Sequence, residues 1–415
     1  MRCEICGLDP CETPGFCEHS RRSDRTNLNW LKHCLMSEGK HPQPLCVLEN
    51  ACVALEKGGV WGLTFDQMAL TAMLAASQPR AVSDDDVSVI QRWMQTSGLK
   101  RIGEKIVGQA IEHVARQYPY HPVRAYLEGL EHDAEPRNHC WLSTYLGAER
   151  NAYNDAIGAM FLRAMVARIL YPGCKADHML ILEGPQGELK STACKILAWK
   201  PQYFSDSMPE LTEHKECSIH LQGKWLIEIS ELHAFSRADN TQLKSFLSRT
   251  DEDYRPVYGT YNIRQPRQCV FIGTSNKDQY LRDETGGRRF WPVKCGAIDV
   301  EALAADRDQL LAEAVLEVRA GLPWWPDHEF EREHIKPEQD KRYEFDEWDN
   351  AVGDYLEAKL LTPTVTTAQI AKEAIGLEAN RLDMMAQKRI AAIMHRRGWK
   401  RAVRNSRRFW EKPLQ

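Results

Sequence analysis

The stretch HMLILEGPQGELKST, residues 178–192, decides how the rest of the chain is interpreted. An apolar run breaks at Gly184, and Lys190 and Ser191 follow six and seven positions later. In a phosphate-binding loop, backbone N–H groups at a helix start surround the phosphates, a lysine neutralises charge and a hydroxyl holds Mg²⁺. Leu189 stands where the usual pattern has glycine. The stretch predicts a strand, a helix from residue 190 and a nucleotide-binding loop of Gly184, Pro185, Gln186, Gly187, Glu188, Leu189, Lys190, Ser191 and Thr192. The alternative is a strand-turn-helix with an incidental lysine.

Helical and strand patterns alternate around this loop. A helix is predicted over 154–170, and further strands over 224–230, 268–274 and 288–293. This alternation predicts an α/β core with a mainly parallel sheet. We expect four parts, namely a possible zinc-binding segment at 1–20, a helical domain at 21–135, the phosphate-loop core at 136–330 and a C-terminal helical unit at 331–415.

The C-terminal unit carries the clearest charge asymmetry. Between Lys388 and Lys412 there are ten Lys or Arg residues against one acid, although the whole chain has a net charge of −4. Thr366 followed by Gln369 predicts a capped helix, and the last strands could form a wing. The unit resembles a winged-helix nucleic-acid binder, and the alternative is a solvated basic face.

Composition excludes several classes of protein. With 43% hydrophobic and 27% charged residues the chain is neither disordered nor fibrous. The apolar run 156–170 contains Arg163 and Arg168, which predicts a buried amphipathic helix rather than a membrane span. No signal peptide is recognisable at the start, so we expect a cytoplasmic location and no membrane partner.

The first residues carry cysteines at metal-ligand density. Cys3, Cys6, Cys11 and Cys17 could give a tetrahedral thiolate site for Zn²⁺, with His19 as a substitute ligand. The spacing of the second pair is unusual, and cysteines present by chance are the alternative.

Polar residues at the ends of the later strands complete a candidate ATP site. Glu228 and Glu231 could hold Mg²⁺ and activate water. Glu231 is preferred because it lies at the carboxyl end of the strand, and the alternative for Glu228 is a strand residue facing solvent. Asn276 could orient water near the γ-phosphate, or simply form a turn. Arg288 and Arg289 could reach a phosphate across a subunit boundary, or be ordinary surface charge.

The segment between the glutamates and the asparagine mixes cations with aromatic rings, as single-stranded nucleic-acid paths do. The candidate DNA-binding residues are Lys244, Arg249, Tyr254, Arg255, Tyr258, Arg264 and Arg267. Alternatively, the segment is a solvated hairpin whose arginines pair with Asp251 and Asp253.

Together these motifs resemble the virulence-associated protein E family of phage and mobile-element proteins, related to superfamily 3 helicases and AAA+ ATPases. The resemblance covers roughly residues 120–345 and is carried by HPVRAYL, ILEGPQGELKST, GKWLIEISEL, QLKSFLSRTDEDYRPVYG, PRQCVFIGTSN and YLRDETGGRRFWPV. Members of that family often lack the last loop glycine. The resemblance therefore implies that Leu189 is a family feature rather than damage, and that the nucleotide site is functional. In the superfamily 3 relatives a hairpin before the asparagine lines the central pore.

The resemblance implies an ATP-dependent DNA motor that acts in replication of phage or mobile-element DNA in a bacterial host. It would work as a homo-oligomeric ring, for example a hexamer, on single-stranded or forked DNA. Ser191 and Glu231 would hold Mg²⁺, and Glu231 would activate water. Two rival hypotheses are a DNA-binding switch that uses nucleotide only to assemble, and a regulatory or defence ATPase without unwinding activity.

Overall fold

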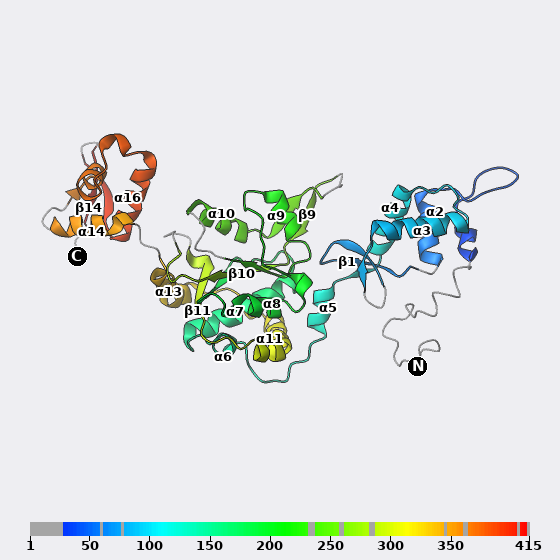
Figure 1. Ribbon diagram of the computed structural model, residues 1–415, viewed down its shortest axis with the longest axis horizontal. Helices are drawn as coiled ribbons and strands as arrows, with labels where there is room; N and C mark the ends of the chain where they lie inside the picture. The colour runs from blue at the N-terminus through cyan, green and yellow to red at the C-terminus, as the bar shows by residue number, and fades with distance from the viewer. Residues whose placement is uncertain are drawn as a thin grey trace.

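The computed structural model describes residues 28–58, 61–75, 79–230, 237–256, 261–281, 287–343, 347–359, 364–404 and 407–412. Figure 1 shows three successive bodies, with the central one holding the largest sheet. Six predicted site residues lie outside the described ranges, namely Cys3, Cys6, Cys11, Cys17, Glu231 and Tyr258. The zinc site and the roles expected of Glu231 and Tyr258 therefore stay predictions.

The central body is a mixed α/β layer around five strands in the order β11-β5-β10-β7-β6, and every neighbouring pair is parallel. This confirms the predicted α/β class with a parallel sheet. The strands are β5 (Met179–Glu183), β6 (Phe204–Ser205), β7 (Leu226–Ile229), β10 (Val270–Ser275) and β11 (Phe290–Lys294).

Helices cover both faces of this sheet, as parallel strands require. In Figure 1, α6 (Trp141–Leu146), α7 (Ala152–Leu170), α8 (Lys190–Leu197) and α11 (Val300–Arg319) lie below the sheet. On the other face lie α9 (His214–His220) and α10 (Arg237–Leu247). Each strand sends alternate side chains to the two faces, so that Leu180 packs in one cluster and Ile181 in the other.

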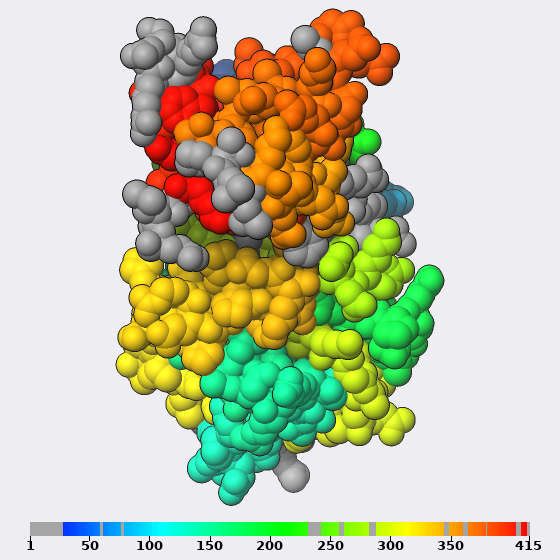
Figure 2. All heavy atoms as spheres, turned by 90° about the vertical axis from the view of Figure 1, so that its left-hand side faces the viewer, coloured from blue at the N-terminus to red at the C-terminus, as the bar shows by residue number. Residues whose placement is uncertain are grey.

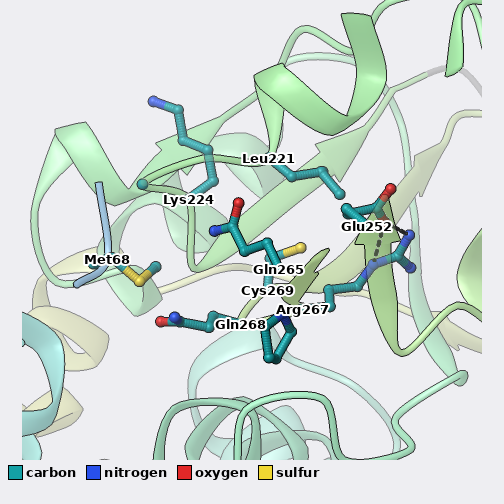
Figure 3. A pocket seen from close by; sticks show the side chains of 10 residues that line it. Met68, Leu221, Lys224, Glu252, Gln265, Arg267, Gln268 and Cys269 are labelled. Atoms are coloured by element: carbon teal, nitrogen blue, oxygen red, sulfur yellow. Dashed lines mark hydrogen bonds and ion pairs between the residues drawn. The ribbon is translucent and has the colours of Figure 1, made fainter. Parts of the chain in front are cut away.

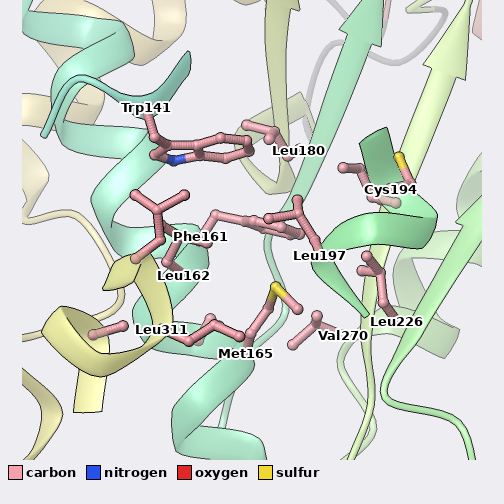
Figure 4. Close-up of a cluster of buried hydrophobic side chains, with 14 of the residues drawn as sticks. Trp141, Phe161, Leu162, Met165, Leu180, Cys194, Leu197, Leu226, Val270 and Leu311 are labelled. Atoms are coloured by element: carbon pink, nitrogen blue, oxygen red, sulfur yellow. The ribbon is translucent and has the colours of Figure 1, made fainter. Parts of the chain in front are cut away.

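The larger cluster, on the α7 face, is the main core of the protein. Trp141, Phe161 and Leu162 pack there against Leu180 and Leu197 (Figure 4). The predicted helix at 156–170 is buried on almost all sides rather than along one stripe, because α7 lies between the sheet and α11. Arg168 is 1% exposed and donates from Nη2 to the carbonyl of Ala176 at 3.2 Å. Its buried charge is thereby partly satisfied by backbone dipoles.

The remaining elements of the central body frame the sheet. They are α5 (Pro122–Glu128), η2 (Pro201–Tyr203), β8 (Asp251–Tyr254), β9 (Ile263–Pro266), η4 (Gly287–Arg289), α12 (His328–Phe330), the π-helix η5 (Glu331–Ile335) and α13 (Lys336–Lys341). Strands β8 and β9 form an antiparallel hairpin.

The N-terminal body is not purely helical, contrary to expectation. Besides η1 (Leu28–His33), α2 (Leu48–Lys57), α3 (Asp84–Ser97) and α4 (Glu104–Arg116), it contains a sheet in the order β3-β2-β1-β4. The strands are β1 (Leu63–Asp66), β2 (Thr71–Leu74), β3 (Arg80–Ala81) and β4 (Pro119–Tyr120). Strands of two to four residues are too short to show an alternating pattern, which is why sequence periodicity missed them. Ser83 caps α3 with a full capping box.

The C-terminal body packs helices on a three-stranded sheet in the order β12-β14-β13. Its elements are α14 (Glu347–Ala358), β12 (Thr364–Val365), α15 (Thr367–Gln369), η6 (Ile370–Ala374), η7 (Ala379–Arg381), α16 (Met384–Arg396), β13 (Lys400–Arg404) and β14 (Arg407–Glu411). The predicted capping box of Thr366 and Gln369 is present. Within the described parts of the chain, no helix is both long and apolar enough to cross a membrane.

Candidate nucleotide-binding site

The loop between β5 and α8 contains two left-handed residues. Gly187 has φ +90° and Leu189 has φ +59°. Glycine adopts this conformation at no steric cost, whereas leucine pays roughly 1–2 kcal/mol for it. The usual preference for glycine at the position of Leu189 therefore has a backbone explanation. Strain of this kind is typically retained at functional sites.

Lys190 begins α8 and its ammonium group folds back over the loop. Nζ donates to the carbonyl oxygens of Gly184 at 2.8 Å and Pro185 at 2.6 Å, and the residue is 9% exposed. A phosphate bound at the helix start would be a stronger acceptor than two neutral carbonyls. The geometry therefore keeps a cation ready where the phosphates would lie.

Glu228 faces the phosphate loop rather than solvent. It is 1% exposed, and its Oε1 accepts hydrogen bonds from Ser191 Oγ at 2.7 Å and Thr274 Oγ1 at 2.9 Å. The alternative in which Glu228 is a solvent-facing strand residue is therefore wrong, because its side chain points to the face of the sheet that α8 covers. The sequence analysis did not identify Thr274 as a site residue. Its position two residues before Asn276, on the same strand end, was the signal that could have found it.

The second carboxylate oxygen of Glu228 fits a cation. Oε2 is buried and has no hydrogen-bond partner among the described residues. A buried unpaired carboxylate oxygen is costly unless something satisfies it. Together with the Ser191 hydroxyl it offers the hard oxygen ligands that Mg²⁺ prefers. Glu228 thus takes the position beside Ser191 that sequence reasoning had given preferentially to Glu231.

The loop and three strand ends enclose one pocket. It has a volume of about 340 Å³ and is lined by Gln186, Gly187, Glu188, Leu189, Lys190, Ser191, Thr192, Glu228, Ser230, Thr274, Ser275 and Asn276. Because β5, β7 and β10 are parallel, their carboxyl ends meet at one edge, where such folds generally bind ligands. The structure therefore brings Lys190, Ser191, Glu228 and Asn276 together in one pocket.

The arginine pair lies at the opposite end of the sheet. Phe290 is in register with Met179, so Arg288 and Arg289 precede β11 at the amino end of β5. The strand length puts them roughly 15–20 Å from the phosphate loop of their own chain. Arg288 is exposed, whereas Arg289 is half-buried with Nε 3.4 Å from the Asp177 carboxylate.

Beside Asp177, burial lowers the pKa of His178 to about 4. The ring of His178 stacks on Trp291, with centroids 4.5 Å apart. The His178 imidazole near the two arginines is therefore neutral at physiological pH.

The candidate DNA-binding residues in and near the β8–β9 hairpin fall into two groups, one accessible to solvent and one buried. Arg255 and Arg264 are exposed, and the Arg264 side chain, 75% exposed, pairs with Asp251 at 3.0 Å. Arg249 is half-buried, with Nη1 3.7 Å from Glu252. The ion pair with Asp251 matches the solvated-hairpin alternative, while the exposed guanidinium groups remain accessible to a polyanion.

Three candidates are buried, and the expectation that they contact DNA is not supported. Arg267 is 2% exposed and its guanidinium binds Glu252 and the carbonyl of Phe246, an ion pair drawn in Figure 3. Tyr254 is 4% exposed and bonds Gln265 through its hydroxyl. Lys244 is 5% exposed and lies over the Phe290 ring. Each of these side chains is buried and has its partner inside the fold, so bases and phosphates cannot reach it.

Replacing Glu228 with glutamine tests the Mg²⁺ assignment. The amide keeps the shape but removes the negative charge, so Mg²⁺-dependent turnover should fall by about 100-fold or more. Nucleotide affinity measured in EDTA should change little. Titration of hydrolysis against Mg²⁺ checks this, with Glu216→Gln, at an exposed carboxylate outside the pocket, as the comparison. Unchanged Mg²⁺ dependence would move the metal site away from Glu228.

Comparison with known proteins gives one family. Residues 127–344, more than half of the chain, match the model described as the virulence-associated protein E-like domain. No curated protein matches the chain. Similar solved structures include the apo structure of the NrS-1 C-terminal region, at 13% identity and TM-score 0.48, covering 84% of this chain and 95% of that one. An A-form apo structure of the same region has 13% identity and TM-score 0.47, covering 85% and 96%.

Proposed function

Because the chain belongs to the virulence-associated protein E-like domain family, we propose that it is an ATP hydrolase that assembles as a ring and moves along DNA during replication of a phage or mobile element. The carrying observation is the convergence of Lys190, Ser191, Glu228 and Asn276 on one pocket at the carboxyl edge of a parallel sheet. This donor and acceptor set suits phosphoryl transfer to water, in which positioning and charge stabilisation supply most of the catalysis.

Each side chain has a distinct role in the proposal. Lys190 leaves the carbonyls of Gly184 and Pro185 and neutralises the β- and γ-phosphates. Ser191 and Glu228 would hold Mg²⁺, which supplies further charge neutralisation when bound. The amide of Asn276 orients the attacking water. Glu231, two residues beyond β7, remains the proposed activator of that water.

The surrounding architecture supports a ring motor with a nucleic-acid-binding extension. We assign the central body to the AAA+ and superfamily 3 type, since β10, which ends directly before Asn276, lies between β5 and β7. The C-terminal order suits a winged helix, since α14 and β12 are followed by the helical elements α15, η6, η7 and α16 and then by the two strands β13 and β14. Arg288, far from its own phosphate loop, suits an arginine that completes a neighbouring subunit's site.

The hairpin arginines provide a test of the DNA path. Changing both Arg255 and Arg264 to alanine should weaken binding of a fluorescent single-stranded oligonucleotide. The magnitude of the slope of log affinity against log salt concentration should fall by about 1.4, because each lost phosphate contact on a single strand releases about 0.7 fewer counterions. Basal ATPase should persist, since neither side chain lines the nucleotide pocket.

The matched control is Arg332→Ala, at an arginine whose side chain is 70% exposed on η5. It removes a comparable surface charge away from the hairpin. A double variant with the wild-type salt slope would place the DNA path elsewhere, with the basic C-terminal unit as the next candidate.

A nucleotide-dependent DNA-binding switch is the second candidate function. It is favoured by the left-handed Leu189, which stands where the usual loop has glycine, because a loop backbone altered there can bind nucleotide without completing hydrolysis. Phosphate release with and without single-stranded DNA separates the two functions. A switch binds DNA in an ATP-dependent manner with negligible turnover and no strand displacement on a forked duplex.

A further inference from the structure

Arg342, just after α13, binds Glu183, the residue immediately before the phosphate loop. Its Nε lies 3.0 and 3.1 Å from the two carboxylate oxygens of Glu183, and its Nη2 lies 2.9 Å from Oε2. Both side chains are buried, at 12% and 5% exposure. Glu183 is the last residue of β5, and Gly184 follows it directly. The fork geometry therefore fixes the base of the phosphate loop from the face opposite α8.

The same residue also holds the segment that follows Asn276. The carbonyl oxygen of Arg342 accepts from the backbone N–H groups of Tyr280 at 3.1 Å and Leu281 at 3.0 Å. Leu281 forms a parallel bridge with Tyr343. Tyr280 Oη donates to Glu183 Oε1 at 2.7 Å. The strand end before the loop and the segment after Asn276 are thus tied to one point.

The next residue reaches the C-terminal body. Arg396, the last residue of α16, donates from Nη2 to Tyr343 Oη at 3.0 Å, and its guanidinium lies 4.4 Å from the ring centroid. Arg396 Nη1 also lies 3.6 Å from the Asp349 carboxylate in α14. In Figure 2 the C-terminal body rests directly above the segment that contains α13. Residues 342 and 343 therefore contact the end of β5, the segment that follows Asn276, and α16.

Electrostatic interactions hold together the junction formed by Arg342 and Tyr343 with Glu183, Tyr280 and Arg396. Burial would lower the pKa of Arg342, but hydrogen bonds and charge from Glu183 and Glu338 outweigh it and raise the pKa. Burial and the Glu183 charge likewise raise the pKa of Tyr280 far above its usual value. Separating the buried pair would leave uncompensated charges, so movement of Glu183 carries Arg342 along with it.

Resting on the proposed function, we infer that Arg342 and Tyr343 transmit nucleotide occupancy of the phosphate loop to α16 and the basic C-terminal body. A nucleotide that takes Lys190 from the carbonyls of Gly184 and Pro185 shifts the residues next to Glu183. Engagement of Asn276 shifts the segment that leads to Tyr280. Arg342 holds both, and Tyr343 passes the change to Arg396. Coupling of this kind is reciprocal, so a ligand on the C-terminal body also changes nucleotide affinity.

Hydrogen–deuterium exchange on the full chain, with and without a non-hydrolysable ATP analogue and Mg²⁺, tests the inference. Binding of the analogue should change exchange in residues 384–396 of the wild-type protein by about fivefold or more, the lower range of measured couplings. In Tyr343→Leu the analogue should bind with wild-type affinity to within about twofold, while the change in α16 disappears. Tyr343→Phe keeps the ring under Arg396 and should retain most of the change.

Two further variants guard against a trivial result. Arg396→Met removes the same contact from the α16 side while keeping an apolar stem, and it should also abolish the response. It serves as the test if Tyr343→Leu fails to fold. Lys388→Met, at an exposed lysine on α16, removes one charge without touching the junction and should leave the response intact.

The outcomes separate the inference from the function beneath it. Absence of nucleotide binding by the wild-type protein overturns the proposed function and this inference with it. Nucleotide binding with unchanged exchange in α16 overturns the inference alone. A response that survives in both Tyr343→Leu and Arg396→Met shows that the signal bypasses the junction, and overturns it equally.

Discussion

Replacing Lys190 with alanine should reduce ATP hydrolysis by about 100- to 1000-fold or more. Lys190 is the one described lysine or arginine that lines the pocket of about 340 Å³, so no other such side chain along that lining can replace its charge. Stabilisation of developing charge by a fixed group in a partly enclosed site is worth this much in other enzymes. Phosphate release by the purified variant, with and without single-stranded DNA, measures the effect.

The control for Lys190→Ala is Lys195→Ala on the same helix. Lys195 is exposed and lies outside the pocket, so its loss removes an equal charge from α8 without emptying the site. Equal melting temperatures for both variants would show that the fold is intact. Turnover by Lys190→Ala at the wild-type rate would contradict the assignment of this loop as the ATP site.

Mixing two inactive variants should restore activity if Arg288 acts on a neighbouring subunit. Lys190→Ala lacks its own phosphate contact, whereas Arg288→Ala fails to complete the neighbour's site. In a random equal mixture about a quarter of the interfaces would pair an intact loop with an intact arginine, so recovery should approach about a quarter of wild-type activity. The position of Arg288 at the amino end of the sheet is the structural reason to expect action between subunits.

Co-assembly must be established by light scattering before activity in the mixture is compared. Arg289→Ala mixed with Lys190→Ala is the matched experiment, because Arg289 is held by Asp177 within its own chain and should give less recovery than Arg288. Co-assembled mixtures with no recovered phosphate release for either arginine would exclude an arginine acting between subunits and weaken the case for a ring motor.

Sequence patterns predicted the core elements well where one local rule was sufficient. Buried parallel strands are short unbroken apolar runs, and β5, β7, β10 and β11 lie within one to two residues of their expected ranges. The capping box at Thr366 was recognised because its two partners are three residues apart in the chain.

Residue types alone did not distinguish surface cations from buried ones. Arg264 and Arg267 are three residues apart in the hairpin region, yet one is largely exposed and the other is 2% exposed against Glu252. The partner of Arg267 lies on the opposite strand, and its burial depends on α10 and β10 packing around it. A local pattern of cations and tyrosines carries no information about that packing.

The sequence by itself determined the α/β class, the turn between β5 and α8, and the succession of strands along the chain, because each depends on neighbours within a few residues. Only the tertiary structure decided that Glu228 meets Ser191 and that Arg288 lies at the far end of the sheet. It alone joined Glu183 to Arg342 across 159 positions of sequence. These contacts depend on strand order, register and the face to which each side chain points, and a shift of one residue in register would reverse every one of those faces.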